Sequence, residues 1–453
     1  MVEAVEKVQD GQAGTYVKEQ AVVALQHRYM VRDALRVLGV VATEVDSDPR
    51  LDLALLAVPG VSEVAQRLRE HGFAEPAEGY PRSEIDWRVV EWGKLAQEIE
   101  DQGRDPVSLD LLLQGLRKGF ENRYSGWIPT MGKNRVVEKV TSAGGIPSRP
   151  GEPHVGGDGD VEPPRSYEAW AARDPGQAAG IHVGILDTRL FPHPWLAGAY
   201  SASPAALLTP ETIAKKADSG RPFGSWAGHA TFVAGLILKR APATHLEVRA
   251  VPFYDDGTAA AWDVARELVS FAGSGVAVLN VSLCCSTQDG KAPLLWERAI
   301  DRLGSGIVVV AAAGNHGDFK DKEGRPNVPP MWPAALDDVL AVGATDRTGA
   351  LARFSPDKPW VDLVAPGVEL ESTYLEGEVT GTERDNNGVF HDKVLPPFHG
   401  FGRWSGTSFS AAEVTGAIAA AAPPERWNAQ EALAIAVGQH GQGGNGIQRF
   451  NTT

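Results

Sequence analysis

The chain has 453 residues, 43% hydrophobic and 22% charged, which is ordinary for a soluble globular protein with room for two or three domains. Its 43 basic and 58 acidic residues give a formal net charge of −15, which argues against nucleic acid as a partner because phosphate backbones are repelled. The two cysteines, Cys284 and Cys285, are adjacent, which excludes a framework of disulfides.

No apolar run approaches the length of a membrane span, so we expect no membrane partner. The first residues also lack a basic segment followed by an apolar one, the pattern of a secretory signal. These features predict a cytoplasmic protein, although the sequence leaves secretion open.

Residues 1–143 are predicted to form a small N-terminal α+β domain. The apolar spacing indicates a strand over 16–25, helices over 27–38 and 61–68, extended runs within 40–58, and further helices over 89–98 and 106–120. Asp105 or Ser108 is the expected cap of the last helix. Residues 144–166 are rich in Gly, Pro and acidic residues and are predicted to be a linker.

Residues 167–445 are predicted to form a second, α/β domain. Short apolar strands are indicated at 183–186, 246–251, 276–283, 307–312 and 339–342, between helices at 230–238, 259–271, 293–303 and 407–422. This alternation favours a parallel sheet sandwiched by helices, with functional sites at the carboxyl ends of its strands. A charged, Gly-rich stretch over 370–403 is expected to be a surface loop that borders the cleft.

Four side chains suited to acyl transfer occur in separate Gly- and Ala-rich islands of this second domain. Asp187 ends a predicted strand, His229 begins a helix, Asn315 follows a strand and a glycine, and Ser408 begins the helix over 407–422. A nucleophilic hydroxyl, a base, a carboxylate that orients the base and an amide that donates to an oxyanion are the groups this chemistry needs. Because a helix N-terminus also favours a neutral imidazole, His229 is suited to act as a base.

Each of the four has a plainer interpretation when taken alone. Asp187 could cap the turn after its strand, and Asn315 could occupy a left-handed turn. Ser408 could be an ordinary N-cap, and a histidine at a helix start is most often a surface residue. The order of all four on an α/β pattern favours the catalytic interpretation over these alternatives.

The islands resemble the subtilisin-like serine peptidases, the subtilase family, over about residues 170–440. The resemblance implies a subtilisin-like fold, with Asp187 as the orienting acid, His229 as base and acid, Ser408 as nucleophile and Asn315 as oxyanion donor. Arg189 and Ala230 stand where the family usually has glycine, and the proline usual after the nucleophile is missing. These departures remove no reactive group.

The same resemblance implies where a substrate binds. Ser282, Leu283 and Cys284 match the segment that pairs with an extended peptide as an added strand, and Gly314 belongs to the same surface. Met331 matches the base of the main specificity pocket. A methionine there makes the pocket shallow, which predicts a preference for small or medium apolar side chains.

The strand and helix order of the N-terminal region weakly resembles that of the family's inhibitory propeptides. A cleaved propeptide, with the cut in residues 144–166, and a retained regulatory domain are both consistent with the sequence. In either case we expect the N-terminal domain to pack on the peptidase domain. Calcium often accompanies the family, but its ligands cannot be placed here, so no cofactor and no metal site is assigned.

Two functions from different classes follow. The first is a serine endopeptidase that acts on protein or peptide substrates through an acyl-enzyme. The second is a catalytically silent pseudoprotease that binds peptides or partners. A sedolisin-type enzyme, which uses a glutamate in place of the histidine, is disfavoured by the island around His229.

Overall fold

The computed structural model describes residues 6–10, 14–74, 83–139, 153–154, 181–220, 222–254, 257–320, 323–384, 390–422, 429–442 and 448–450. These residues belong to two compact units. The first contains Met1–Val137, Thr258–Val269 and Cys285–Arg302, and the second contains Glu138–Gly257, Ser270–Cys284 and Leu303–Thr453. The predicted linker over 144–166 lies outside the described residues except for Pro153 and His154.

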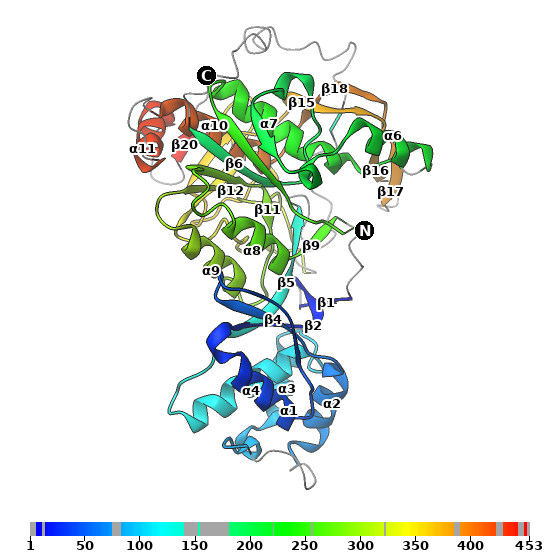
Figure 1. Ribbon diagram of the computed structural model, residues 1–453, viewed down its shortest axis with the longest axis vertical. Coiled ribbons are helices and arrows are strands. Elements are labelled where there is room, and N and C mark those ends of the chain that lie inside the picture. The colour runs from blue at the N-terminus through cyan, green and yellow to red at the C-terminus, as the bar shows by residue number, and fades with distance from the viewer. Residues whose placement is uncertain are drawn as a thin grey trace. The chain divides into compact units, whose positions relative to one another are not determined.

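The first unit is an antiparallel sheet with helices (Figure 1). Its strands are β1 (Lys7–Gln9), β2 (Thr15–Ala24), β3 (Thr43–Asp48), β4 (Leu53–Ala57), β5 (Met131–Lys139) and β9 (Thr258–Ala260), in the order β5-β2-β4-β3 with β1 paired to β2. Its helices are α1 (Arg28–Val37), α2 (Val61–His71), α3 (Trp92–Asp101), α4 (Leu109–Arg123), α8 (Ala261–Val269) and α9 (Leu294–Leu303). The predicted α+β character of the N-terminal region is confirmed.

Helix α4 shows how the sequence builds this unit. Ser108 caps it by accepting a hydrogen bond from the Asp110 backbone N–H, as predicted. Gly115 and Gly119 face the rings of Trp92 and Trp87 so closely that a β-carbon at either position would clash. Small residues on the helix therefore let two large aromatic side chains fill the core.

The second unit is built on a nine-stranded sheet. Its strands are β6 (His182–Asp187), β7 (Tyr200–Ala202), β8 (His245–Ala250), β10 (Val278–Val281), β12 (Val308–Ala312), β13 (Val339–Thr345), β14 (Leu363–Pro366), β19 (Gly441–Gln442) and β20 (Gln448–Phe450). The order is β19-β20-β14-β13-β12-β10-β6-β8-β7, and only the β19–β20 pairing is antiparallel. The predicted parallel sheet is confirmed.

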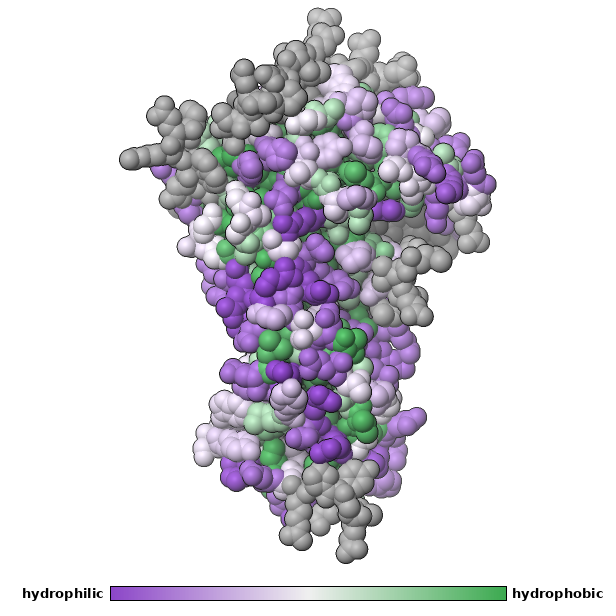
Figure 2. Space-filling model, viewed as in Figure 1, coloured by the Kyte–Doolittle hydropathy of each residue, from purple (hydrophilic) through white to green (hydrophobic). Residues whose placement is uncertain are grey.

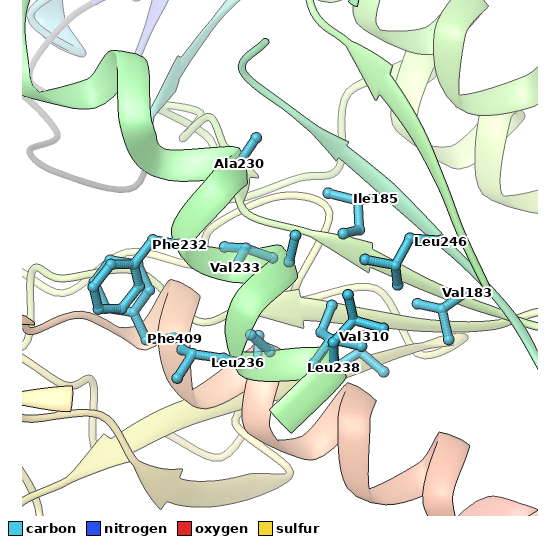
Figure 3. Close-up of a cluster of buried hydrophobic side chains, with 14 of the residues drawn as sticks. Val183, Ile185, Ala230, Phe232, Val233, Leu236, Leu238, Leu246, Val310 and Phe409 are labelled. Carbon is cyan, nitrogen blue, oxygen red and sulfur yellow. The ribbon is translucent and has the colours of Figure 1, made fainter. Parts of the chain in front are cut away.

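Helices α7 (His229–Arg240) and α10 (Thr407–Ala421) pack together on this sheet, and α6 (Pro210–Asp218) and α11 (Ala429–His440) complete the described helices of the unit. Figure 3 shows the apolar cluster in which side chains of α7 meet those of three strands and of α10. The labelled residues are Val183, Ile185, Ala230, Phe232, Val233, Leu236, Leu238, Leu246, Val310 and Phe409. Each fully buried Val, Leu, Ile or Phe contributes about 1.5–3 kcal/mol, so this cluster fixes both helices firmly.

The stretch over 370–403 is not the surface loop that the sequence predicted. It forms two antiparallel pairs, β15 (Leu370–Gly377) with β18 (Phe398–Trp404), and β16 (Thr380–Arg384) with β17 (Phe390–Val394). Tyr374 and Phe398 are fully buried there. The composition misled because charged and glycine residues stand between aromatic ones, which face the core.

No helix among the described residues is long and apolar enough to cross a bilayer. On the face seen in Figure 2, hydrophobic residues lie among hydrophilic ones.

Candidate active site

Asp187 and His229 lie together at the carboxyl end of β6. The imidazole Nδ1 is 2.7 Å and 2.8 Å from the two carboxylate oxygens of Asp187, and both side chains are 1% exposed. Oδ1 of Asp187 also accepts a hydrogen bond from the Thr188 backbone N–H. Because a carboxylate only accepts, Nδ1 carries the proton and the neutral ring presents Nε2 as a lone pair.

The position of His229 depends on a close approach at its N-cap, Gly228. A β-carbon on Gly228 would clash with the ring of Tyr374. Strand β15, which carries Tyr374, therefore packs directly against the start of α7. Ser372 and Thr373 also donate hydrogen bonds to the Phe232 and Thr231 carbonyls of α7. The unpredicted hairpin thus holds the helix that carries the histidine.

Three aromatic rings surround the imidazole of His229. Trp226 stacks on it with ring centroids 4.7 Å apart, while Trp404 meets it edge-on at 5.5 Å and Phe409 lies tilted at 5.4 Å. Trp226 and Trp404 could not be predicted from the sequence, because neither stands in a recognisable island. The rings restrict the imidazole to one orientation.

Ser408 is not an N-cap, because α10 begins at Thr407 with Gly406 as its cap and no side-chain capping bond. Its hydroxyl is buried and has no hydrogen-bond partner among the residues that the structure describes, and the same holds for Nε2 of His229. Gly406 has φ +159, and a β-carbon at this position would make only ordinary contacts with Phe409 and Asn315. A hydroxyl and a lone-pair nitrogen are thus both left unpaired at the ends of two helices that pack together.

Asn315 is tied to the residue before Ser408. Its Oδ1 accepts hydrogen bonds from the Thr407 backbone N–H at 2.9 Å and from the Thr407 hydroxyl at 3.1 Å. The Thr407 hydroxyl in turn accepts from the Gly314 N–H at 3.1 Å. The left-handed residue of this turn is Gly314, with φ +99, and not Asn315. These bonds direct the NH₂ end of the amide away from Thr407.

The segment predicted to bind substrate is already paired with another strand. Strand β11 (Leu283–Cys284) runs antiparallel to the last two residues of β5, with Leu283 opposite Lys139 and Cys284 opposite Glu138. All four residues belong to the second unit. The side chain of Ser282 is buried and accepts a hydrogen bond from Asn280, so only the backbone of this segment is suited to pair with a peptide.

Met331 is buried beside Gly314: a β-carbon on Gly314 would lie 3.1 Å from its Cγ. The structure therefore brings the predicted base of the pocket next to the residue that precedes Asn315. Cys284 and Cys285 are both buried and are not joined in a disulfide, and the Sγ of Cys285 accepts a hydrogen bond from the Trp296 indole N–H.

A buried ion pair joins the two helices of the site and was missed from the sequence. Nε of Arg240, at the end of α7, is 2.5 Å from Glu413 of α10, whose side chain is 4% exposed. Burial raises the pKa of Glu413 despite this partner. A lone glutamate in a small-residue helix gave no periodic signal.

The family is decided by comparison with known proteins. Residues 178–436 match the subtilase family model, Peptidase S8. The chain belongs to the subtilase family. The resemblance on which the sequence analysis relied is therefore confirmed, and with it the subtilisin-like fold.

Individual relatives cover part of this subtilase. It is 34% identical over 222 residues to the thermophilic serine proteinase of Bacillus sp. (strain AK1), which is 46% of this chain and 45% of that protein. Subtilisin BL of Lederbergia lenta is 32% identical over 219 residues, 46% of this chain and 71% of that protein. The match thus spans less than half of the first relative's length.

Among solved structures, the subtilase is similar in fold to fervidolysin from Fervidobacterium pennivorans, a keratinolytic enzyme related to subtilisin. The TM-score is 0.50 at 17% identity, covering 92% of this chain and 57% of fervidolysin. Within the described ranges, no group of three or more His, Cys, Asp or Glu is arranged to hold a metal ion.

Proposed function

We propose that this subtilase is a serine endopeptidase that hydrolyses peptide bonds through an acyl-enzyme. The observation that carries the proposal is the bond between Asp187 and His229, which leaves Nε2 of the imidazole as a buried, unpaired base. Ser408, whose hydroxyl is equally unpaired, is the proposed nucleophile.

In the proposed reaction, the Ser408 Oγ attacks the carbonyl carbon of the peptide while its proton passes to Nε2 of His229. The carbonyl oxygen becomes an oxyanion, to which the Asn315 amide and the Ser408 backbone N–H donate. The C–N bond then breaks and the proton moves from His229 to the leaving amine. Water hydrolyses the ester by the reverse sequence, with Asp187 holding the imidazolium throughout.

The proposed substrate is a protein or peptide that adds a strand along Ser282, Leu283 and Cys284, with Gly314 beside the reacting carbonyl. Met331 limits the pocket to small or medium side chains. Hydrogen bonds to the backbone of this segment supply affinity for a substrate whatever the substrate's sequence.

We further propose that residues 1–143 are an inhibitory propeptide and not a permanently retained domain. The support is the antiparallel pairing of Glu138 and Lys139 with β11, the segment that a substrate would use. A substrate cannot pair there while β5 does. The cut is expected in residues 144–166, and the peptidase domain is then 167–445.

The pseudoprotease remains the rival because the Ser408 hydroxyl and Nε2 of His229 are not bonded to each other and all three side chains of the proposed triad are 1% exposed. A fluorophosphonate probe separates the two, since it reacts only with an activated serine. The full chain is treated beside Ser408→Ala, His229→Ala and Ser410→Ala. Ser410 is the matched control, because its hydroxyl lies on the same helix but donates to the Ala365 carbonyl.

Labelling of the parent and of Ser410→Ala, with none of the other two, supports the endopeptidase. No labelling of the parent, even after limited proteolysis within residues 144–166 has released the proposed propeptide, supports the pseudoprotease. The intact mass of each sample reports on the propeptide: a cut within 144–166 in the parent but not in Ser408→Ala supports it. A labelled parent that stays uncut contradicts it.

A further inference from the structure

His316, the residue after Asn315, has an unpaired acceptor atom deep in the second unit. The side chain is 1% exposed, and its Nε2 lies 2.8 Å from the Pro329 carbonyl oxygen. Since a carbonyl only accepts, Nε2 carries the proton. In the neutral ring Nδ1 is then a lone pair, and no group in the described part of the chain donates to it.

The surroundings of His316 keep this ring neutral. Burial lowers its pKa to about 4, and the positive charge of Lys358 acts in the same direction. The ring lies between the aromatic side chains of Phe319 and Trp360, at centroid distances of 5.9 Å and 6.3 Å. A buried acceptor without a donor costs about 1–3 kcal/mol, so a ligand that donates to Nδ1 recovers that free energy.

Nδ1 of His316 lies beside Gly314, the residue before the proposed oxyanion donor Asn315. A β-carbon on Gly314 would lie 2.7 Å from Nδ1 and 3.1 Å from Cγ of Met331. In the proposed reaction the substrate oxygen lies at the Asn315 amide, and the side chain of the same substrate residue begins two bonds from the carbonyl carbon. A substrate bound in this way would place that side chain near Gly314 and His316.

We propose that His316 determines specificity: the residue on the acyl side of the cut is of medium size and carries an uncharged hydrogen-bond donor, asparagine above all. The inference rests on the proposed function and changes the apolar preference that Met331 alone predicted. Leucine has nearly the shape of asparagine but leaves Nδ1 unpaired. Aspartate presents a charged acceptor to a lone pair, and lysine would have to lose its hydration.

The test is a set of fluorogenic peptides that are identical except for Asn, Leu or Asp at this position. For the parent, kcat/KM is expected to be about tenfold higher with Asn than with Leu, the value of one net hydrogen bond, and lowest with Asp. His316→Phe keeps a ring but has no acceptor, so Leu should equal or exceed Asn. His316→Gln can bond Pro329 and still offer an oxygen, so it should keep part of the preference.

Phe319→Leu is the matched control, because it alters a ring contact of His316 without touching Nδ1, and it should keep the parent ratio. Equal rates for Asn and Leu in the parent overturn the inference, as does an unchanged ratio in His316→Phe. If His316→Phe does not fold, the parent panel and His316→Gln decide. A parent that reacts with the fluorophosphonate but cuts none of the peptides also overturns it, whereas an unreactive parent contradicts the proposed function itself.

Discussion

A network of buried charges in the first unit contrasts with the candidate site in the second. In the first unit, Oδ2 of Asp10 forms ion pairs with both Lys133, at 2.9 Å, and Arg135. Lys133 is shared with Asp110 at 2.7 Å. Burial acts to raise the pKa of Asp10, but the charges of Arg135 and Lys133 hold it below its ordinary value.

The site in the second unit keeps unpaired atoms instead. Three buried atoms have no partner in the described part of the chain: Nε2 of His229, the hydroxyl of Ser408 and Nδ1 of His316. Each costs about 1–3 kcal/mol. The unpaired buried atoms of the first unit, such as Oδ1 of Asp10, belong to side chains that form ion pairs. We infer that this charge network serves stability, whereas the unpaired atoms of the site are kept available for a substrate.

Ser408→Ala should separate activity from stability most sharply. Peptidase activity is expected to fall about a millionfold, the size of the loss seen when a subtilisin loses its nucleophile. The free energy of unfolding should stay constant or rise, because an unpaired buried hydroxyl is removed. Urea unfolding and peptide hydrolysis measure the two. A destabilisation equal to that of Ser410→Ala, which loses a real hydrogen bond, would contradict the contrast.

Lys133→Met should lower the free energy of unfolding, whereas Ser408→Ala should lower activity. Its side chain is 6% exposed, and removing it takes one of two cationic partners from both Asp10 and Asp110, which keep only Arg135 and Arg104, respectively. A loss of about 3–5 kcal/mol in the free energy of unfolding is expected in urea. The exposed pair of Lys118 and Glu121 provides the control, since Lys118→Met should cost less than about 1 kcal/mol. Equal costs for both would refute a stabilising network.

Asn315→Leu should lower kcat about 100- to 1,000-fold with little change in KM, because one donor to the oxyanion is lost. Thr407→Val is the companion variant: it removes one of the two bonds to Oδ1 but retains the backbone bond and the amide donor. A loss within about tenfold is expected for it. If steady-state kinetics show the same loss in both, Asn315 acts through loop structure instead of donation.

His193→Asn should make the free energy of unfolding less dependent on pH below pH 6.5. Burial lowers the pKa of His193 to about 4, below its ordinary value of 6.5, so the unfolded state binds the proton first as pH falls. The resulting stability is fully present above pH 6.5 and is lost towards pH 4, by at most about 3 kcal/mol.

Asparagine can still accept from the Trp195 N–H, as His193 does through Nδ1, but it does not titrate. The difference in unfolding free energy between pH 7 and pH 4.5 should therefore shrink by about 2 kcal/mol in His193→Asn. It should not change in His71→Asn, whose side chain is 73% exposed. If His193→Asn loses as much unfolding free energy between pH 7 and pH 4.5 as the parent, other groups cause the loss of stability in acid.

The family, the parallel sheet and the pairing of Asp187 with His229 could be predicted because local signals carry them. Strand β6 is a short apolar run that ends in an acid, and α7 and α10 begin in small-residue islands. The hairpin of β15 and β18 could not be predicted, because its charged composition hides the buried rings of Tyr374 and Phe398. Strand β5 was missed since its pairing partners lie far away in the chain.

By itself the sequence determined which reactive groups the protein has and in what order they follow, because these depend on residue identity and on apolar periods of a few residues. Tertiary structure alone decided which of them are paired. The bond of His229 to Asp187, the lone pair of His316 and the pairing of Glu138 with Cys284 all join or separate atoms by the path of a whole chain. No local pattern encodes such contacts, because they depend on how distant segments exclude water together.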